Sequence, residues 1–198
     1  MIELFPEAKI DDFSRSILED NGEGAHTYDH TRRVLQVCLE IGNTMGAKIR
    51  ILGAAALLHD IGRPFEEQYG KSHSVISGEL SKRFLEDIGY TDHEIEEVLS
   101  AIRTHRFSEG IEPISLEGRI LSDADKLDAI GAIGVFRSIA QATVSGKGLR
   151  GFLEHADEKL LKLKDMLYTQ EASRIAHDRH SLLERFVKQL RMEISASD

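Results

Sequence analysis

The stretch ILGAAALLHDIGRPF, residues 51–65, combines an apolar segment with an abrupt polar ending. Its first half suits a buried helix, yet His59 and Asp60 follow at once, and Gly62 and Pro64 come just after them. Gly62 suits a left-handed helix cap and Pro64 cannot continue a helix, so Asp60 falls near the helix end. A carboxylate is unfavourable there unless a cation lies beside it. The pair therefore predicts either two ligands of a divalent metal or a polar helix end that is hydrogen-bonded to its neighbours.

Helical periodicity extends over nearly the whole chain. Apolar residues recur at intervals of three and four, and a capping-box pattern precedes one of these stripes at Thr91–Glu94. No alternating strand pattern and no internal repeat is present. We expect an all-α fold that starts with an amphipathic helix at 5–20. The connections are expected at 21–25, 62–72, 107–114 and about 145–151.

One domain is expected over residues 1–198, with a metal-site core at about 20–130 and C-terminal helices at 131–194 packed on it. The single cysteine, Cys38, excludes an internal disulfide framework. The net charge of −9 argues against broad nucleic-acid or anionic-membrane binding. No apolar run is long enough to span a bilayer, and no secretory signal is visible. These features predict a cytoplasmic protein with no membrane partner, and they leave a homo-oligomer open.

Several histidines fall on the core-facing sides of the expected helices. His30 lies one turn before an apolar stripe, and His26 lies one turn before His30. His73 lies three residues before Ile76 and His105 three residues after Ile102, and both isoleucines belong to apolar stripes. Buried imidazoles need partners, and a metal site shared with His59 would provide them all at once.

The segment SDADKLDAIG, residues 122–131, adds carboxylates to this set. Asp125 lies one helical turn after Leu121 and can point inward. Asp128 lies one residue after Leu127, so it is either an inward-facing or an exposed helix acid.

Taken in order, His30, the His59–Asp60 pair and Asp125 resemble the H…HD…D signature of the HD superfamily of metal-dependent phosphohydrolases. HTYDHTRRV, SHSVISGEL and HADEKLLKLKDMLYT are also similar to segments of small stand-alone HD proteins. The resemblance covers about residues 20–192 and implies a helical bundle of the HD-domain type. One departure is Arg63, where many members carry lysine.

The resemblance implies a role for each matching residue. The first metal would be held by His30, His59, Asp60 and Asp125. His73 and His105 match positions that bind a second metal in some HD subgroups, bridged by the aspartate of the pair, or that face the phosphate in others.

Further residues are expected to act as catalytic or supporting groups. Asp60 is expected to orient the attacking water as well as to bind metal. Basic side chains near the motif would meet phosphate oxygens; we expect this of Arg63 and Lys126 in the reaction, and Lys71 and Arg106 lie near it too. Residues expected just outside the ligands are His26, Arg33 and Asp128.

Imidazole and carboxylate ligands without thiolate suit Mn²⁺, Fe²⁺, Co²⁺, Ni²⁺, Zn²⁺ or Mg²⁺, with one or two ions per chain. The expected reaction is cleavage of a phosphomonoester or phosphodiester, of a nucleotide or a related small phosphate ester, by a metal-activated water. Two alternatives remain. One is a di-iron HD-type oxygenase, and the other is a non-catalytic module that binds a structural metal or a nucleotide.

Other polar residues are assigned no chemistry. Glu66 and Glu67 are interpreted as solvated acids, and Cys38 as a small core residue. No metal binding is expected at the remaining histidines, which are His93, His155, His177 and His180.

Overall fold

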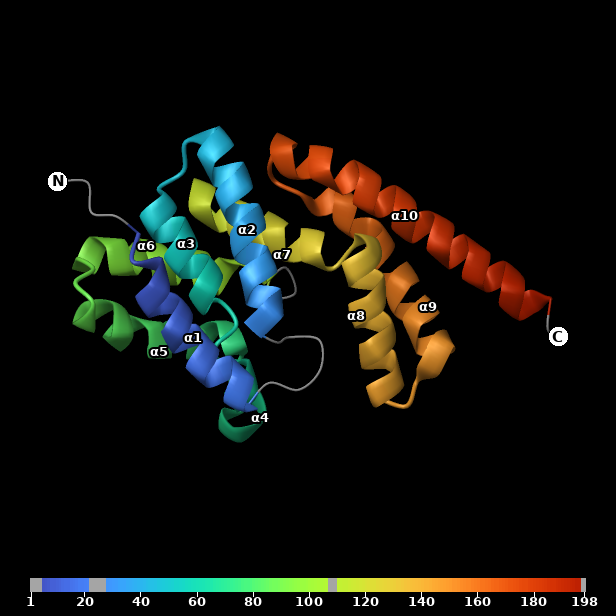
Figure 1. Cartoon of the computed structure of the whole chain (residues 1–198), viewed down its shortest axis with the longest axis horizontal. Helices are drawn as coiled ribbons and strands as arrows, with labels where there is room; N and C mark the ends of the chain where they lie inside the picture. Colours follow the sequence, from blue (N-terminus) through green and yellow to red (C-terminus); the bar gives the residue numbers. More distant parts are fainter. Residues whose placement is uncertain (1–4, 22–27, 107–109, 197–198) are drawn as a thin grey trace. The chain divides into compact units, whose positions relative to one another are not determined.

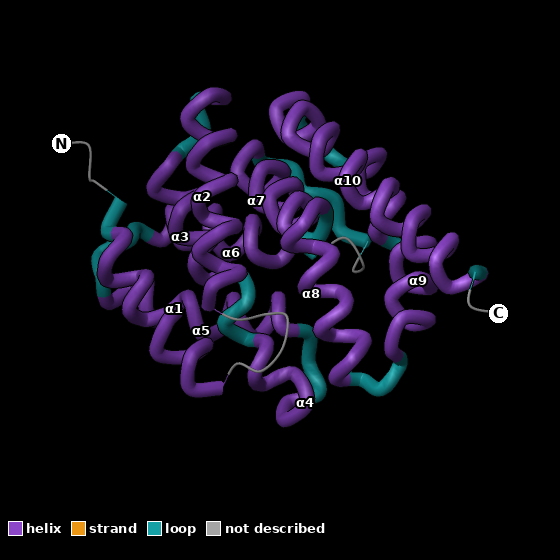
Figure 2. Tube along the Cα trace, turned by 45° about the vertical axis from the view of Figure 1, so that its right-hand side comes forward, coloured by secondary structure: helices purple, strands orange, loops and turns teal. Residues whose placement is uncertain are grey.

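A computed structural model describes residues 5–21, 28–106 and 110–196. All regular elements in these ranges are helices, as Figure 2 shows, which confirms the all-α prediction. The α-helices are α1 (Glu7–Asn21), α2 (Tyr28–Met45), α3 (Ile49–Leu58), α4 (Glu66–Tyr69), α5 (His73–Asp87), α6 (Asp92–Thr104), α7 (Leu116–Asp128), α8 (Gly131–Val144), α9 (Gly148–Glu158) and α10 (Gln170–Ser195). Two 3-10 helices complete the set, η1 (Arg63–Phe65) and η3 (Leu160–Met166).

The chain forms two compact units, residues 1–125 and 126–198. The first holds α1 to α6 and most of α7, and the second holds the end of α7 and α8 to α10, all labelled in Figure 1. The expected extent of a metal-site core and its C-terminal helices stays a prediction.

Helix α3 is the centre of the first unit and packs against α1, α2 and α6. Its residues 51–58 are all buried, as expected of a helix that is apolar on every side. Gly53 makes room for the N-terminal segment, because a Cβ there would lie 2.5 Å from the Phe5 ring. The amphipathic helix predicted at 5–20 is confirmed as α1.

The turn after α3 differs from the expectation. Gly62 has φ of −80°, so it is not a left-handed cap. It is needed for close packing instead, because a Cβ would lie 2.5 Å from the carbonyl oxygen of His73. The Gly62 amide also donates to Oγ of Ser77 over 2.8 Å. The turn is thereby held against the start of α5, which brings Asp60 beside His73.

Three other expectations are corrected. The segment 62–72 is not a plain loop, because it contains η1 and α4. Helix α9 starts at Gly148, inside the loop expected at about 145–151. The apolar spacing of Leu160, Leu163 and Leu167 predicts an α-helix, but the structure has the 3-10 helix η3 there. The capping box of α6 is confirmed, with Oγ1 of Thr91 accepting from the Glu94 amide.

In the second unit, α8 packs against α9 and α10, and η3 packs against α9 and α10. The end of α7 is held by arginines: Arg179 donates to the Leu127 carbonyl over 2.7 Å, and Arg137 donates to the Asp128 carbonyl over 3.3 Å. Among the described residues, no single helix has the length and apolar composition to cross a membrane. Two consecutive helices with a bend between them, Leu116–Asp128 and Gly131–Val144, together have enough length and apolar composition. Buried core helices commonly meet the same criterion.

Candidate metal centre

Four histidines and one aspartate meet in the interior of the first unit. His30 lies on α2, the adjacent pair His59 and Asp60 directly follows α3, His73 is the first residue of α5, and His105 directly follows α6. None of these side chains is more than 1% exposed. The structure thus brings together residues that are up to 75 positions apart in the chain, counting from His30 to His105.

Hydrogen bonds set the orientation of three of the imidazole rings. Each ring has Nδ1 against an oxygen that can only accept: His59 against the Ala56 carbonyl at 2.7 Å, His105 against the Ile102 carbonyl at 2.5 Å, and His73 against the Glu66 carboxylate at 2.9 Å. Nδ1 must therefore carry the proton, and a neutral ring then presents the Nε2 lone pair.

Asp60 faces both pairs of rings with different oxygens. Its Oδ2 lies 3.6 Å from Nε2 of His30 and 3.6 Å from Nε2 of His59. Its Oδ1 lies 3.2 Å from Nε2 of His73 and 3.8 Å from Nε2 of His105. The two Nε2 atoms within each pair are 3.4 Å apart. Converging lone pairs and a carboxylate fit a divalent cation in each group, with Asp60 common to both.

Asp125 joins the first of these groups. Its Oδ1 lies 3.3 Å from Nε2 of His30, and its side chain is 29% exposed. Burial raises the pKa of this carboxyl, but the adjacent His30 ring outweighs burial and holds the pKa well below its ordinary value. Asp125 is therefore ionised at neutral pH and can act as a fourth ligand.

Burial keeps the imidazoles of His59 and His73 neutral. It lowers the pKa of His59 to about 3, against the opposing effect of Asp60. Burial likewise lowers the pKa of His73 to about 4. Both rings are therefore available as metal ligands at neutral pH without losing a proton.

Two polar residues from the segment after Asp60 contact the ligands. Arg63 donates from Nε to Oδ2 of Asp60 over 2.8 Å. Oε1 of Glu66 accepts from the amide and from Nδ1 of His73, each over 2.9 Å. The interpretation of Glu66 as a solvated acid is wrong. A four-residue helix is too short to show periodicity, so only the proximity of this acid to HDIGR would have drawn attention to it.

The other residues expected to face phosphate or to support the ligands lie on several different segments. His26 lies outside the described residues. Arg33 is half-buried on α2, and Lys71 pairs with Glu79 over 2.9 Å. NH1 of Arg106 lies 3.6 Å from Oε1 of Glu66.

In the second unit, Nζ of Lys126 lies 4.7 Å from the centre of the Tyr168 ring. Asp128 is buried and accepts from NH1 of Arg137 over 2.5 Å. The roles expected for Lys126 and Asp128 in the reaction stay predictions.

The groups of metal-ligand side chains in the described part of the chain are those around Asp60. His93 is 79% exposed, and His180 lies 3.0 Å from Glu184. Cys38 is fully buried, and burial raises the pKa of its thiol above the ordinary range.

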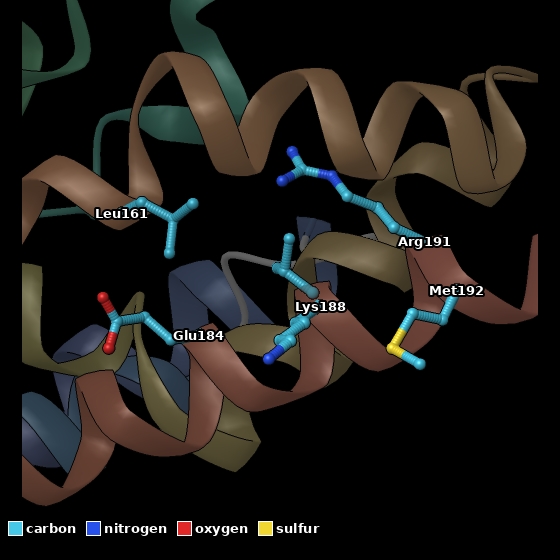
Figure 3. Close-up of a pocket in the computed structure, with 6 residues that line it drawn as sticks. Leu161, Glu184, Lys188, Arg191 and Met192 are labelled. Atoms are coloured by element: carbon cyan, nitrogen blue, oxygen red, sulfur yellow. The ribbon is translucent and has the colours of Figure 1, made fainter.

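A separate hollow of about 400 Å³ lies between η3 and α10 in the second unit (Figure 3). Two of its charged side chains have ionic neighbours: Arg191 pairs with Asp157, and Glu184 lies 3.8 Å from Nζ of Lys164. The residues that line it are Leu161, Glu184, Val187, Lys188, Arg191 and Met192. It contains no set of ligands like the one around Asp60.

The fold and the site together are those of an all-helical protein with two pairs of buried histidines around one aspartate, which is a metal-binding arrangement. The family model described as HD domain matches residues 27–130. The chain is also 34% identical over 207 residues to YpgQ of Bacillus subtilis, covering 100% of this chain and 98% of that protein. The chain therefore belongs to the HD domain family.

Solved structures and a longer relative agree with this assignment. The crystal structure of Bacillus subtilis YpgQ in complex with ADP is similar with a TM-score of 0.80 at 27% identity, covering 97% of this chain and 100% of that one. The crystal structure of a predicted HD superfamily hydrolase from an uncultured Thermotogales bacterium is similar with a TM-score of 0.71 at 32% identity. The match covers 94% of this chain and 91% of that one. Ribonuclease Y of Treponema denticola is 33% identical over 106 residues, which are 54% of this chain and 19% of that protein.

Proposed function

We propose that the protein is a metal-dependent phosphohydrolase that acts on a nucleotide or a related small phosphate ester. The observation that carries this proposal is Asp60, whose two oxygens face two separate pairs of imidazole nitrogens. Membership of a hydrolase superfamily supports the reaction class. The ADP complex of YpgQ supports a nucleotide as the ligand.

The residues divide into two ligand groups. His30, His59, Asp60 and Asp125 would hold one divalent cation, and His73 and His105 would share Asp60 in holding a second. When bound, a divalent cation supplies a Lewis acid that polarises a phosphoryl oxygen and lowers the pKa of a water molecule. Mn²⁺, Fe²⁺, Co²⁺, Ni²⁺, Zn²⁺ and Mg²⁺ all suit this set of nitrogen and oxygen donors.

The protein's own groups would orient the reactants. Asp60 would orient the attacking water toward the phosphorus. Arg63, already on Oδ2 of Asp60, would offset negative charge as it develops on the phosphoryl oxygens. Lys126 is proposed as a second cation for the same charge, with Arg33 and Asp128 supporting the ligands. The negative net charge of the chain makes such local positive groups necessary for an anionic substrate.

A di-iron oxygenase is the second candidate, because the six side chains that it needs all lie in this unit and the shared Asp60 suits an iron pair. Bound iron with a mixed-valent spectroscopic signal would favour this candidate. A cytoplasmic location stays a prediction, and a homo-oligomer stays open.

The test is release of phosphate or nucleoside from a panel of nucleotides and phosphate esters, with added Mn²⁺ and with EDTA as the control. Metal-dependent release from one class of compound is expected. No release from any compound, by protein shown to be folded and metal-loaded, would favour the oxygenase or a non-catalytic metal- or nucleotide-binding module.

A further inference from the structure

We infer that Glu66 is a positioning residue that controls occupancy of the second cation position through His73. The inference rests on the proposed function, since it needs a cation between His73, His105 and Asp60. It assigns a role to α4, a helix of four residues that directly follows η1.

The Nδ1 proton of each ring needs an acceptor. His59 and His105 follow the ends of α3 and α6, so the carbonyl three residues earlier in the same helix lies against Nδ1. The last carbonyls of a helix have no intrahelical partner, and these rings satisfy one of them. Both ligands are therefore oriented by their own helices.

His73 cannot be oriented in this way. It is the first residue of α5, so no helical turn precedes it. Its acceptor comes from another helix, where Oε1 of Glu66 meets both Nδ1 and the backbone amide of His73 at 2.9 Å. Because one oxygen contacts the backbone and the ring of the same residue, it restricts the rotation of the side chain and directs Nε2 at Asp60.

The chemistry of the acceptor adds to this effect. A carboxylate on Nδ1 makes the ring a stronger ligand than a carbonyl does. Two guanidinium groups lie near the same carboxylate, with NH1 of Arg106 3.6 Å from Oε1 and NH1 of Arg63 3.9 Å from Oε2. The Glu66 carboxylate is therefore held between these guanidinium groups and the two N–H groups of His73.

The second cation position is the more dependent on such support. The first group has four ligands, whereas the second has His73, His105 and the shared Asp60. Loss of one oriented ligand from a group of three leaves two, and the affinity for a cation falls sharply. Glu66→Ala should therefore weaken the second position and leave the first intact.

The experiment is a titration of chelator-treated full-length protein with Mn²⁺ alone, followed by calorimetry and by electron paramagnetic resonance, which distinguishes a coupled pair from a single ion. Wild type should bind two ions per chain and give a coupled signal. Glu66→Ala should bind the second ion about 10–100-fold more weakly, with the first unchanged. Glu67→Ala is the matched control, since the adjacent Glu67 is exposed on the same helix, and it should behave as wild type.

The route through His73 is tested in a His73→Ala background, where adding Glu66→Ala should cause no further loss. An additional loss there, or unchanged second-ion affinity in folded Glu66→Ala, would overturn the inference. So would a wild type that binds one ion only. Two bound ions without hydrolysis of any phosphate ester would overturn the proposed function and leave the role of Glu66 standing.

Discussion

The guanidinium of Arg63 donates from Nε to Oδ2 of Asp60 over 2.8 Å, three residues along the chain. This bond fixes the plane of the carboxylate whose two oxygens face the two pairs of rings. Lysine, found here in many HD proteins, would supply the charge but not the planar geometry of Nε.

Arg63→Ala should therefore lower kcat for a phosphate ester by about 10–100-fold, through loss of both orientation and charge. Arg63→Lys should recover part of that loss. Steady-state kinetics at saturating Mn²⁺ measure both. Full activity of the alanine variant would show that Asp60 keeps its orientation without this bond.

The metal content should depend on whether the removed carboxylate belongs to both ligand groups or to one of them. Asp60→Ala is expected to lose both ions and all activity, because each group loses a ligand. Asp125→Ala should bind the first ion more weakly and lose activity in parallel, because three ligands remain in that group, and it should keep the second ion. Elemental analysis after gel filtration gives the metal content. Asp12→Ala, an exposed acid on α1, is the control and should keep the content of wild type.

The turn at Gly62 gives a prediction for stability. Gly62→Ala places a Cβ against backbone of α5, with the His73 carbonyl oxygen 2.5 Å and the Ser77 amide nitrogen 2.6 Å away. We expect the free energy of unfolding to fall by about 1–3 kcal/mol in urea denaturation. Gly78→Ala, where a Cβ meets only side chains at 3.8 Å, should change it by less than about 1 kcal/mol. Equal effects at the two positions would argue against close packing as the reason for Gly62.

The metal-free protein should lose stability as pH falls from about 7 to 5. The pKa of His59 is about 3 and that of His73 about 4 in the folded chain, against 6.5 for an ordinary histidine. Over this range the unfolded chain binds protons that the folded chain does not, so lower pH favours unfolding.

Thermal unfolding in the presence of EDTA at several pH values checks this expectation. His59→Gln should flatten the pH dependence, because it removes one of the buried rings. His93→Gln, at an exposed position, should leave it as in wild type. A midpoint that does not change with pH would contradict the neutral state assigned to the buried rings.

Cys38 is the single cysteine of the chain and lies fully buried on α2. Since burial raises the pKa of its thiol, little thiolate forms near neutral pH. A colourimetric thiol reagent should detect no reactive group in the native protein and one per chain in urea. Rapid reaction of the folded protein would show that α2 opens.

The helices and most of the site were predictable because each depended on a local pattern. The stripe on α2 placed His30 inward, and the apolar run of α3 led directly to His59 and Asp60. The predictions that were wrong concerned residues whose roles depend on contacts between distant segments. The need for Gly62 comes from the backbone of α5.

The role of Glu66 in the site also depends on a contact that the local sequence does not indicate. Its role comes from the position of His73 at the start of a helix, seven residues later, where no local acceptor exists for the ring. A four-residue helix gives no periodicity, so an acid at its first position was indistinguishable from a solvated one. Pairing of this kind becomes visible only when both ends are placed in space.

A metal-dependent reaction at Asp60 is tested most directly by phosphate release from nucleoside phosphates. Chelator-treated wild type and Asp60→Ala are compared as Mn²⁺ is added back. We predict no release without metal, a rise to a plateau as the ions bind, and no rise for the variant. Equal release with and without metal, or the same rise for Asp60→Ala, would contradict a metal-dependent reaction at this site.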